Sequence, residues 1–363
     1  MAGNIERAGR RLLAGAMRSI RGSSDAVGSI PAGTRLRSIL LMRWDAVGDL
    51  MVCLPWFRKT REVFPRARVG IVVSRRNRDL LKYEPEFTAI LYDSEPATYL
   101  RSLLLARRFR PNAVVDTRMH YDSTTSFIYG VVSGAEWMLS ADNRTRRLPF
   151  NVRVPMPTAR MHNSDMTRLL LCGLGRDIPD ADLDREVRLS TAELDFADGF
   201  WRTAGLRYRG RTVGINISAR DPLHSWPLAG VRELCTLLVG SGRKPVLFSV
   251  PSEHSEVTAL AVAVPGTLAA PPCPGILHAA ALIRDMAMFV TPDTGLVHVA
   301  SSYGVPTVGL YVPNEEHLPL WFPWRVENEV LMGEGAVSSI AVGDVMDAVE
   351  RLSCRTRAQG TEI

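Results

Sequence analysis

Short apolar runs alternate along the first half of the chain with segments of helical periodicity. Four of these runs predict strands, at residues 38–42, 69–73, 89–92 and 113–116. The continuous apolar run 38–42 is typical of a strand buried on both faces of a parallel sheet. A loop through Gly48-Asp49 leads to a helical pattern, and we expect Pro55 to kink or restart that helix. Another helix is predicted over residues 99–108. This order of elements indicates a βαβ series.

The second half of the chain repeats the pattern. Strands are predicted at residues 211–217, 245–249, 286–290 and 307–311, and helices at 191–205, 231–239, 252–263, 276–284 and 342–352. We expect Thr191 to cap the first of these helices, with Glu193 in its first turn. By contrast, residues 143–157 are polar, rich in arginine and broken by prolines, which predicts an exposed loop rather than core.

The length of the chain, 363 residues, favours two α/β domains. We place a basic segment at 1–34, an N-terminal domain at 35–185 and a C-terminal domain at 186–363. A hydrophobic fraction of 46% is enough for two buried cores. No apolar run reaches the roughly 20 residues that cross a bilayer, and no signal-peptide pattern is found. We therefore expect a soluble, cytoplasmic protein.

The cysteines are scattered, without the spacing of a zinc site or of a disulfide framework. They are predicted to be small buried thiols in a reducing compartment: Cys53, Cys172, Cys235, Cys273 and Cys354.

A net charge of +6 favours an anionic partner, either a phosphorylated substrate or an anionic membrane face. Nucleic acid is not favoured, because the arginines are spread along the chain without interleaved aromatic residues. Residues 1–22 combine five arginines with apolar residues in a weakly amphipathic pattern. This segment is either a peripheral membrane anchor or a leader that contacts nothing.

Two strand-to-helix turns have candidate chemistry, one in each half of the chain. In the first, Gly48-Asp49 follows a buried strand, at the sheet edge where open α/β folds bind ligands. A carboxylate at a helix start is held ionised, as a general base must be, but aspartate is also a common helix N-cap. Asp45 is a second carboxylate in the same loop.

The second turn is Asp293-Thr294-Gly295, which precedes an apolar helical pattern. Backbone N–H groups at such a helix start attract anions, phosphates above all. His298 lies one turn further on, where it either reaches the same ligand or is a core histidine.

The two turns belong to a wider resemblance. Three motifs carry it: Gly48-Asp49 followed by Pro55, the pair Trp226-Pro227, and the run from Asp293 to Ala300 followed by Gly304-Val305-Pro306-Thr307. With these motifs the chain resembles glycosyltransferase family 9, the lipopolysaccharide core heptosyltransferases. The resemblance implies the α/β architecture called GT-B, with two facing Rossmann-like domains that contain parallel sheets. The acceptor is then expected on the N-terminal domain and a nucleotide-sugar on the C-terminal one.

The resemblance also assigns roles to residues. Asp49 matches the catalytic base of the family, and the matching donor-binding residues are Ser218, Ala219, Glu253, Asp293, Thr294, Gly295 and His298. The family usually has a lysine two residues before the Trp-Pro pair, where this chain has His224. A cation there stabilises the departing diphosphate. Either Arg220 or protonated His224 replaces it, or the donor or the rate differs from that of the usual heptosyltransferase, or the chain has lost activity.

The sequence therefore predicts an inverting glycosyltransferase that needs no metal ion and no cofactor. ADP-heptose is the expected donor, and an anionic lipopolysaccharide or related glycan the expected acceptor. The alternative is a catalytically silent protein of the same fold that binds a nucleotide-sugar or polyanion. A dinucleotide-dependent oxidoreductase is not supported, because Gly240-Ser241-Gly242 lacks the third glycine of its fingerprint. The acidic run 180–184 resembles a metal-binding DxD motif, but no predicted strand precedes it.

Overall fold

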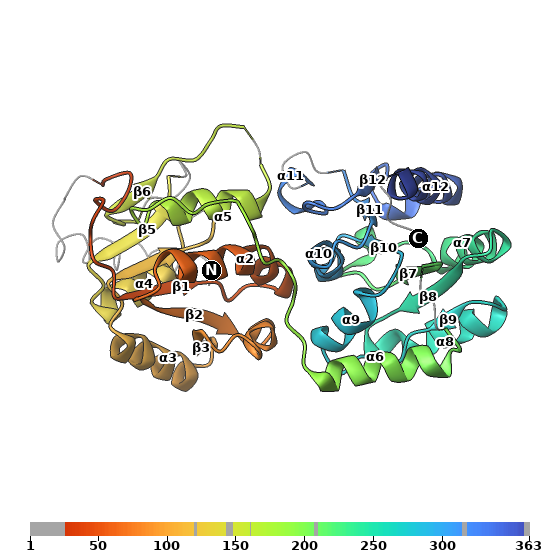
Figure 1. The fold of residues 1–363 in the computed structure, drawn as a ribbon, viewed down its shortest axis with the longest axis horizontal. Helices are drawn as coiled ribbons and strands as arrows, with labels where there is room; N and C mark the ends of the chain where they lie inside the picture. Colours follow the sequence, from red (N-terminus) through yellow and green to blue (C-terminus); the bar gives the residue numbers. More distant parts are fainter. Residues whose placement is uncertain are drawn as a thin grey trace, which may run out of the picture. The chain divides into compact units, whose positions relative to one another are not determined.

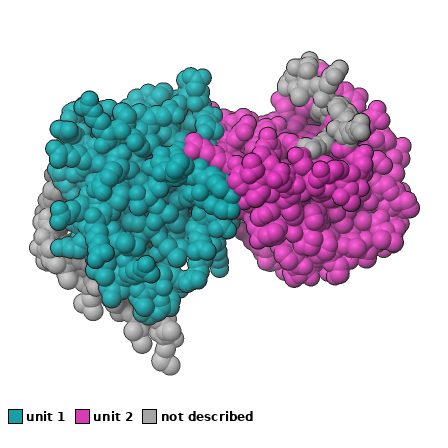
Figure 2. All heavy atoms as spheres, turned by 60° about the horizontal axis from the view of Figure 1, so that its bottom comes forward, with its two compact units in different colours: residues 1–184 teal, residues 185–363 magenta. Residues whose placement is uncertain are grey.

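The computed structural model describes residues 26–119, 122–142, 148–159, 161–206, 210–313 and 318–358. The chain divides into two compact units, Met1–Asp184 and Arg185–Ile363 (Figure 2). Each unit contains a six-stranded parallel sheet with helices packed against it (Figure 1). Within the described ranges, no helix is long and apolar enough to cross a membrane. The basic segment 1–22 lies outside the described residues.

The first unit has the strand order β3-β2-β1-β4-β5-β6. Its strands are β1 (Ser38–Met42), β2 (Arg68–Ser74), β3 (Phe87–Tyr92), β4 (Ala113–Asp116), β5 (Trp137–Ala141) and β6 (Val152–Val154). Its helices are α2 (Val47–Val63), α3 (Pro96–Phe109), α4 (Thr124–Ser133) and α5 (Asn163–Cys172), with a 3-10 turn η1 (Arg78–Leu81). Helix α2 packs against α5, and α3 packs against α4. Buried side chains of β1, β2 and β4 form one core with α3 and α4.

The second unit has the strand order β12-β11-β10-β7-β8-β9. Its strands are β7 (Thr212–Asn216), β8 (Lys244–Phe248), β9 (Leu268–Ala269), β10 (Met288–Pro292), β11 (Thr307–Tyr311) and β12 (Asn328–Met332). Its helices are α6 (Thr191–Thr203), α7 (Leu228–Gly240), α8 (His254–Ala263), α9 (Ile276–Ile283), α10 (Gly295–Ser302), α11 (Leu318–Trp321) and α12 (Val342–Ala358). The 3-10 turns are η2 (Pro222–His224), η3 (Pro251–Glu253) and η4 (Val337–Ser339). Its core is formed by the strands together with α7, α8 and α12.

Both sheets have the same topology. Numbered along the chain within each unit, the strands lie in the order 3-2-1-4-5-6. In such a sheet the strand order reverses between the first and fourth strands, and ligands bind beyond the carboxyl ends of the strands at that point. The reversal lies between β1 and β4 in the first unit and between β7 and β10 in the second. These two places are where a binding site is expected.

Helix α2 differs from the prediction at its start. It begins at Val47, so Gly48 and Asp49 lie in its first turn rather than in a loop, and its N-cap is Ala46. It also continues through Pro55 to Val63 as one helix, without a restart. Every residue from Leu50 to Thr60 is buried, so packing outweighs the hydrogen bond that the proline cannot donate.

Three other predictions need correction. The segment 143–157 is not an exposed loop throughout, because Leu148 and Phe150 are buried and β6 pairs with β5. Ser190, not Thr191, caps α6, and it forms a capping box with Glu193. The cysteines are free thiols, but Cys354 is exposed, and Cys172 and Cys273 are only half-buried.

Candidate active site

Asp49 lies at the reversal point of the first sheet, as the third residue of α2. It is therefore not the N-cap of the helix. Its Oδ2 accepts a hydrogen bond from the backbone N–H of Ala46 at 3.0 Å, and its Oδ1 lies 2.7 Å from Nη2 of Arg43. The side chain is 18% exposed. Asp49 is thus held by two donors, and its side chain is not fully buried.

Arg43 connects the two strands that flank the reversal point. It directly follows β1, and its side chain is only 5% exposed. Nε donates to the carbonyl of Asp49, and Nη1 donates to the carbonyl of Thr117, which follows β4, each at 3.0 Å. The hydroxyl of Thr117 in turn donates to the carbonyl of Met42 at 2.7 Å. This network fixes the guanidinium, and through it the Asp49 carboxylate, relative to the sheet.

Burial raises the pKa of the Asp49 carboxyl above its ordinary value, and the Arg43 guanidinium partly opposes this rise. A carboxylate with a raised pKa is a stronger base than an exposed aspartate. Asp116, the last residue of β4, is fully buried, and burial raises its pKa to about 7. The carboxyl edge of this sheet therefore contains two perturbed carboxyl groups beside one buried guanidinium.

A second cation, partly exposed, pairs with the same loop. The Arg118 guanidinium pairs with the Asp45 carboxylate, with Nε 3.0 Å from Oδ1, and it stacks over the Trp44 ring at 4.6 Å from the centroid. Asp45 thus pairs with Arg118 and more distantly with Arg43, whose Nη1 lies 3.8 Å from its Oδ2, whereas Asp49 pairs with Arg43 at 2.7 Å. The two carboxylates of the loop have different environments, and Asp49 is the one built into the helix start.

In the second unit, the predicted turn lies at the reversal point between β7 and β10. Thr294 is the N-cap of α10, and its Oγ1 accepts from the N–H of Leu296 at 3.3 Å. Gly295 is the first helical residue. Asp293, half-buried, donates its N–H to the carbonyl of Leu310 on β11 at 3.2 Å. The turn therefore has the expected form of a helix start that offers backbone N–H groups to an anion.

Asn216 joins this turn to the neighbouring strand. It ends β7, and its Nδ2 lies 3.1 Å from Oγ1 of Thr291, 3.3 Å from Oγ1 of Thr294 and 3.0 Å from the carbonyl oxygen of Ser218. Its Oδ1 accepts from the N–H of Ser218 at 3.1 Å. One amide side chain thus holds both segments that border the reversal point.

Ser218 and Glu253 are in direct contact. The Ser218 hydroxyl donates to Oε2 of Glu253 and accepts from the N–H of Val250 at 2.8 Å. Ala219 follows in the same half-buried segment. The structure therefore brings Ser218, Glu253 and Thr294 to the carboxyl edge of one sheet, although they lie far apart in the sequence.

Arg220 and His224 lie together around Asp221. His224 Nδ1 is 2.7 Å from Oδ1 of Asp221, and Arg220 Nε is 3.3 Å from Oδ2. The hydrogen bond with His224 lowers the pKa of Asp221, which therefore stays ionised. The His224 side chain is 11% exposed, whereas that of Arg220 is 56% exposed. Of the two candidate cations, Arg220 is the accessible one.

His298 is buried in α10, and its ring packs against Trp321 with centroids 5.8 Å apart. Burial lowers the pKa of His298 to about 4, so the imidazole is neutral at pH 7. A contact between His298 and a donor therefore remains a prediction, and it would be made by a neutral ring.

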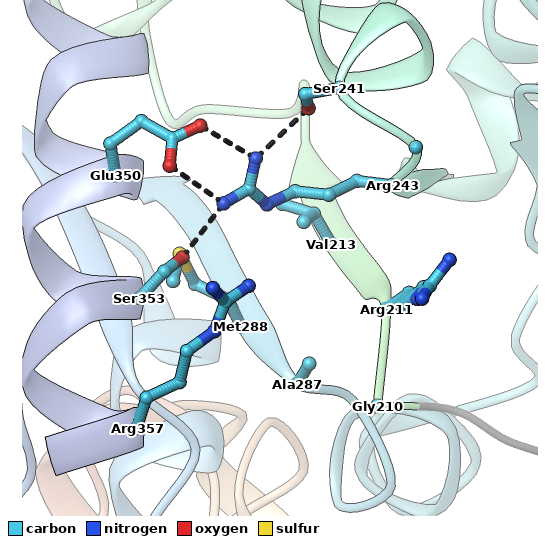
Figure 3. Close-up of a pocket in the computed structure, with 11 residues that line it drawn as sticks. Gly210, Arg211, Val213, Ser241, Arg243, Ala287, Met288, Glu350, Ser353 and Arg357 are labelled. Carbon is cyan, nitrogen blue, oxygen red and sulfur yellow. Dashed lines mark hydrogen bonds and ion pairs between the residues drawn. The ribbon is translucent and has the colours of Figure 1, made fainter. Parts of the chain in front are cut away.

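A cavity of about 350 Å³ lies at the opposite, amino edge of the second sheet (Figure 3). Arg243, at its border, is already bound by Glu350, with Nη1–Oε1 at 2.7 Å, and by the hydroxyls of Ser241 and Ser353. These bonds connect the end of α7 to α12. Because the predicted donor turn lies at the other edge, we assign this cavity no part in catalysis.

The sequence pattern did not indicate a role for Arg43, Arg118 or Asn216. Each lies at the carboxyl end of a strand or directly beyond it. A polar residue that ends an apolar run was the available signal, but only the structure shows which of these residues meet.

Among the described residues, no cluster of three histidine, cysteine or acidic side chains could hold a metal ion. In the acidic run, Asp184 forms an ion pair with Arg58, with Nη1–Oδ1 at 3.2 Å.

Residues 135–338 match the model of glycosyltransferase family 9 (heptosyltransferase), more than half of the chain. The chain belongs to glycosyltransferase family 9. The resemblance seen in the sequence is confirmed, and this family member is a glycosyltransferase. It is 23% identical over 287 residues to the lipopolysaccharide core heptosyltransferase OpsX of Haemophilus influenzae, covering 76% of this chain and 79% of that protein.

Solved structures confirm the GT-B fold of this family 9 chain. A glycosyltransferase family 9 protein from Veillonella parvula superposes with a TM-score of 0.74 at 19% identity, covering 87% of this chain and 97% of that one. The E. coli ADP-heptose lipopolysaccharide heptosyltransferase II gives a TM-score of 0.67 at 21% identity, covering 88% and 99%.

Proposed function

We propose that this glycosyltransferase moves heptose from ADP-heptose to a lipopolysaccharide or related anionic glycan, with inversion at the anomeric carbon and without a metal ion. The observation that carries the proposal is the Asp49 carboxylate, held by Arg43 and Ala46 at the reversal point of the first sheet. The names of two relatives support the substrates, since one is a lipopolysaccharide core heptosyltransferase and the other is named for ADP-heptose.

Asp49 is the proposed general base. The acceptor hydroxyl attacks the anomeric carbon in a single displacement, which inverts that centre, and its proton passes to the carboxylate as the bond to the diphosphate breaks. Burial favours this role, because it raises the pKa of Asp49 and so increases its basicity. Arg43 acts on the reaction through Asp49 and is a positioning residue, not a catalytic one.

Arg118 is the proposed contact for an anionic acceptor. Its guanidinium lies beside the same loop as Asp49, stacked over Trp44 and 20% exposed. The stacked Trp44 ring and the paired Asp45 carboxylate hold the guanidinium plane beside this loop, where its charge attracts a carboxylate or phosphate. This places a cation next to the proposed base within one unit.

The donor diphosphate is proposed to bind at the start of α10, with Thr294 and Gly295 supplying the hydroxyl and backbone N–H groups. Asp293 orders this turn. Ser218, Ala219 and Glu253 are proposed to contact the remainder of the nucleotide, and His298 to contribute as a neutral ring. These assignments follow the family resemblance together with the clustering of the residues at one sheet edge.

Arg220 is the proposed cation for the departing diphosphate. Both side chains pair with Asp221, but Arg220 is permanently charged and more than half exposed, whereas His224 is mostly buried. The charge that a metal ion supplies in other sugar transferases would then come from Arg220 and the start of α10. We expect EDTA to leave the rate of transfer unchanged. If EDTA abolished transfer and Mg²⁺ or Mn²⁺ restored it, the proposal that no metal ion is needed would be contradicted.

The second candidate function is a silent nucleotide-sugar-binding protein. The observation in its favour is His224, which stands where the family usually has a lysine. The test is to incubate the wild-type protein with ADP-heptose and a heptose-free lipopolysaccharide acceptor while measuring ADP release. Release that depends on the acceptor supports the transferase, and donor binding without any release supports the silent protein.

A further inference from the structure

The outer face of α3 is unusual among the surfaces of the described chain. Leu100, Leu104 and Leu105 are 59%, 52% and 37% exposed, all within six residues of one helix. No other element in the described ranges has more than two such large exposed apolar side chains. Single exposed leucines need no explanation, but a contiguous group on one helix face indicates an interaction surface.

Helix α3 has a separate face for the core, so its outer leucines are not needed for folding. Ser102, Ala106 and Phe109 are buried, at helical spacing, and Leu103 packs partly against the same core. The helix is fixed in place by a cap at each end: Glu95 accepts from the N–H of Thr98 at 2.7 Å, and Arg110 is left-handed at φ 50. The outer face is therefore presented by a rigid helix.

Arginines flank these leucines along the helix, whereas the acidic residues Asp93 and Glu95 precede it. Arg101, Arg107, Arg108 and Arg110 are all exposed, and α3 itself contains no acidic residue. On the helix surface, i, i+4 spacing aligns Leu100 with Leu104 and Arg108, and in the neighbouring row it aligns Arg101 with Leu105. Leucine side chains flanked by arginines complement a layer that has an apolar interior and an anionic surface.

We propose that this face of α3, defined by Leu100, Leu104, Leu105 and the four flanking arginines, docks on an anionic phospholipid leaflet. The leucines enter the boundary of the acyl chains, and the arginines extend to the lipid phosphates. The surface lies in the described part of the chain, so it is distinct from the segment 1–22.

A chain of aromatic rings connects this helix to the proposed acceptor loop. The Tyr99 ring, on the first turns of α3, lies 5.8 Å from Tyr92, and Tyr92 lies 5.3 Å from Trp44, over which Arg118 stacks. Docking through α3 would bring that loop close to the leaflet, where a lipid-linked acceptor is held. This use of the surface rests on the proposed function, whereas the binding itself does not.

The test measures sedimentation of the full chain with vesicles, without donor or acceptor, so it is independent of transfer activity. The variant L100Q/L104Q removes apolar area from the surface, and L228Q/L237Q is the matched control, since both of its leucines are exposed on α7, at 40% and 42%. Vesicles contain phosphatidylcholine with or without phosphatidylglycerol, and circular dichroism checks that each variant is folded.

We expect the wild type and L228Q/L237Q to bind the anionic vesicles alike, and L100Q/L104Q to bind about tenfold more weakly. R101Q/R108Q should lose the part of the binding that high salt also removes. Equal sedimentation of the wild type and L100Q/L104Q would overturn the proposal. So would a dimer in solution that L100Q/L104Q converts to a monomer, because the face would then belong to a second copy of the chain.

Discussion

The Arg43 guanidinium contacts Asp49 twice, with Nη2 2.7 Å from the carboxylate Oδ1 and Nε 3.0 Å from the backbone carbonyl oxygen. Its remaining nitrogen donates to the carbonyl of Thr117. Two strands and the helix start are therefore joined through one buried side chain. The position and the pKa of the proposed base both depend on Arg43.

Replacing Arg43 by glutamine should change the pH dependence of transfer. Because Arg43 lowers the pKa of Asp49, its loss should raise that pKa further. The base must be ionised to accept a proton, so the acidic limb of the kcat/KM profile should move to higher pH. We also expect kcat to fall about 10- to 100-fold, since the carboxylate loses its orientation. An unshifted acidic limb would show that Arg43 does not act through Asp49.

Replacing Asn216 by alanine should weaken donor binding. The change removes the amide that holds Ser218, Thr291 and Thr294 together, and we expect about tenfold lower affinity for ADP by calorimetry. The control is Asn328→Ala on β12, where Nδ2 also donates to a backbone carbonyl, at 2.8 Å, but far along the sheet from β7. Equal losses of affinity in the two variants would contradict a role for Asn216 at the donor turn.

Replacing Arg220 by alanine should reduce kcat more than donor affinity, because its charge is needed most as the diphosphate departs. We expect a loss of about 100-fold in kcat, and His224→Gln should cost less. Arg232→Ala, an exposed arginine on α7, is the control and should leave transfer unchanged. A larger loss in His224→Gln than in Arg220→Ala would transfer the role to the histidine.

Asp122 should be important for stability rather than for catalysis. It is fully buried, and its carboxylate accepts from Arg153 at 2.6 Å, from Ser140 at 2.5 Å and from the N–H of Leu148 at 2.6 Å. Asp122→Ala leaves Arg153 without its buried partner and should lower the free energy of unfolding by about 3–5 kcal/mol in urea. Glu350→Gln breaks the half-exposed pair with Arg243 and should cost no more than about 1 kcal/mol. Similar losses for both would be inconsistent with this account.

The hydrogen-bond network of Asp122 explains why the sequence pattern of β6 was misleading. β6 has only three residues, lies between prolines and contains Arg153, so its pattern is that of a surface loop. Only its pairing with β5 and the buried Asp122 reveal that Arg153 belongs to the interior. A three-residue edge strand has too little periodicity to be distinguished from a turn.

The apolar runs of β1, β4 and β11 were predicted well because burial leaves little ambiguity, but β10 begins two residues later than predicted and the buried strand β5 was not predicted. The bounds of β4 and β11 agree with the prediction to the residue. At the site, the sequence indicated both helix starts, since turn chemistry is local. It could not indicate that Arg43 reaches Thr117, because that contact crosses 74 residues and depends on the strand order.

The transfer activity of Asp49→Asn tests the central claim most directly. Asparagine keeps the shape of the side chain but cannot accept the acceptor proton. With ADP-heptose and a heptose-free lipopolysaccharide acceptor, we predict that kcat falls about 10²- to 10⁴-fold while ADP affinity, measured by calorimetry, is unchanged. Turnover by Asp49→Asn equal to that of the wild type would contradict the account, because the proposed base would then have no part in the reaction.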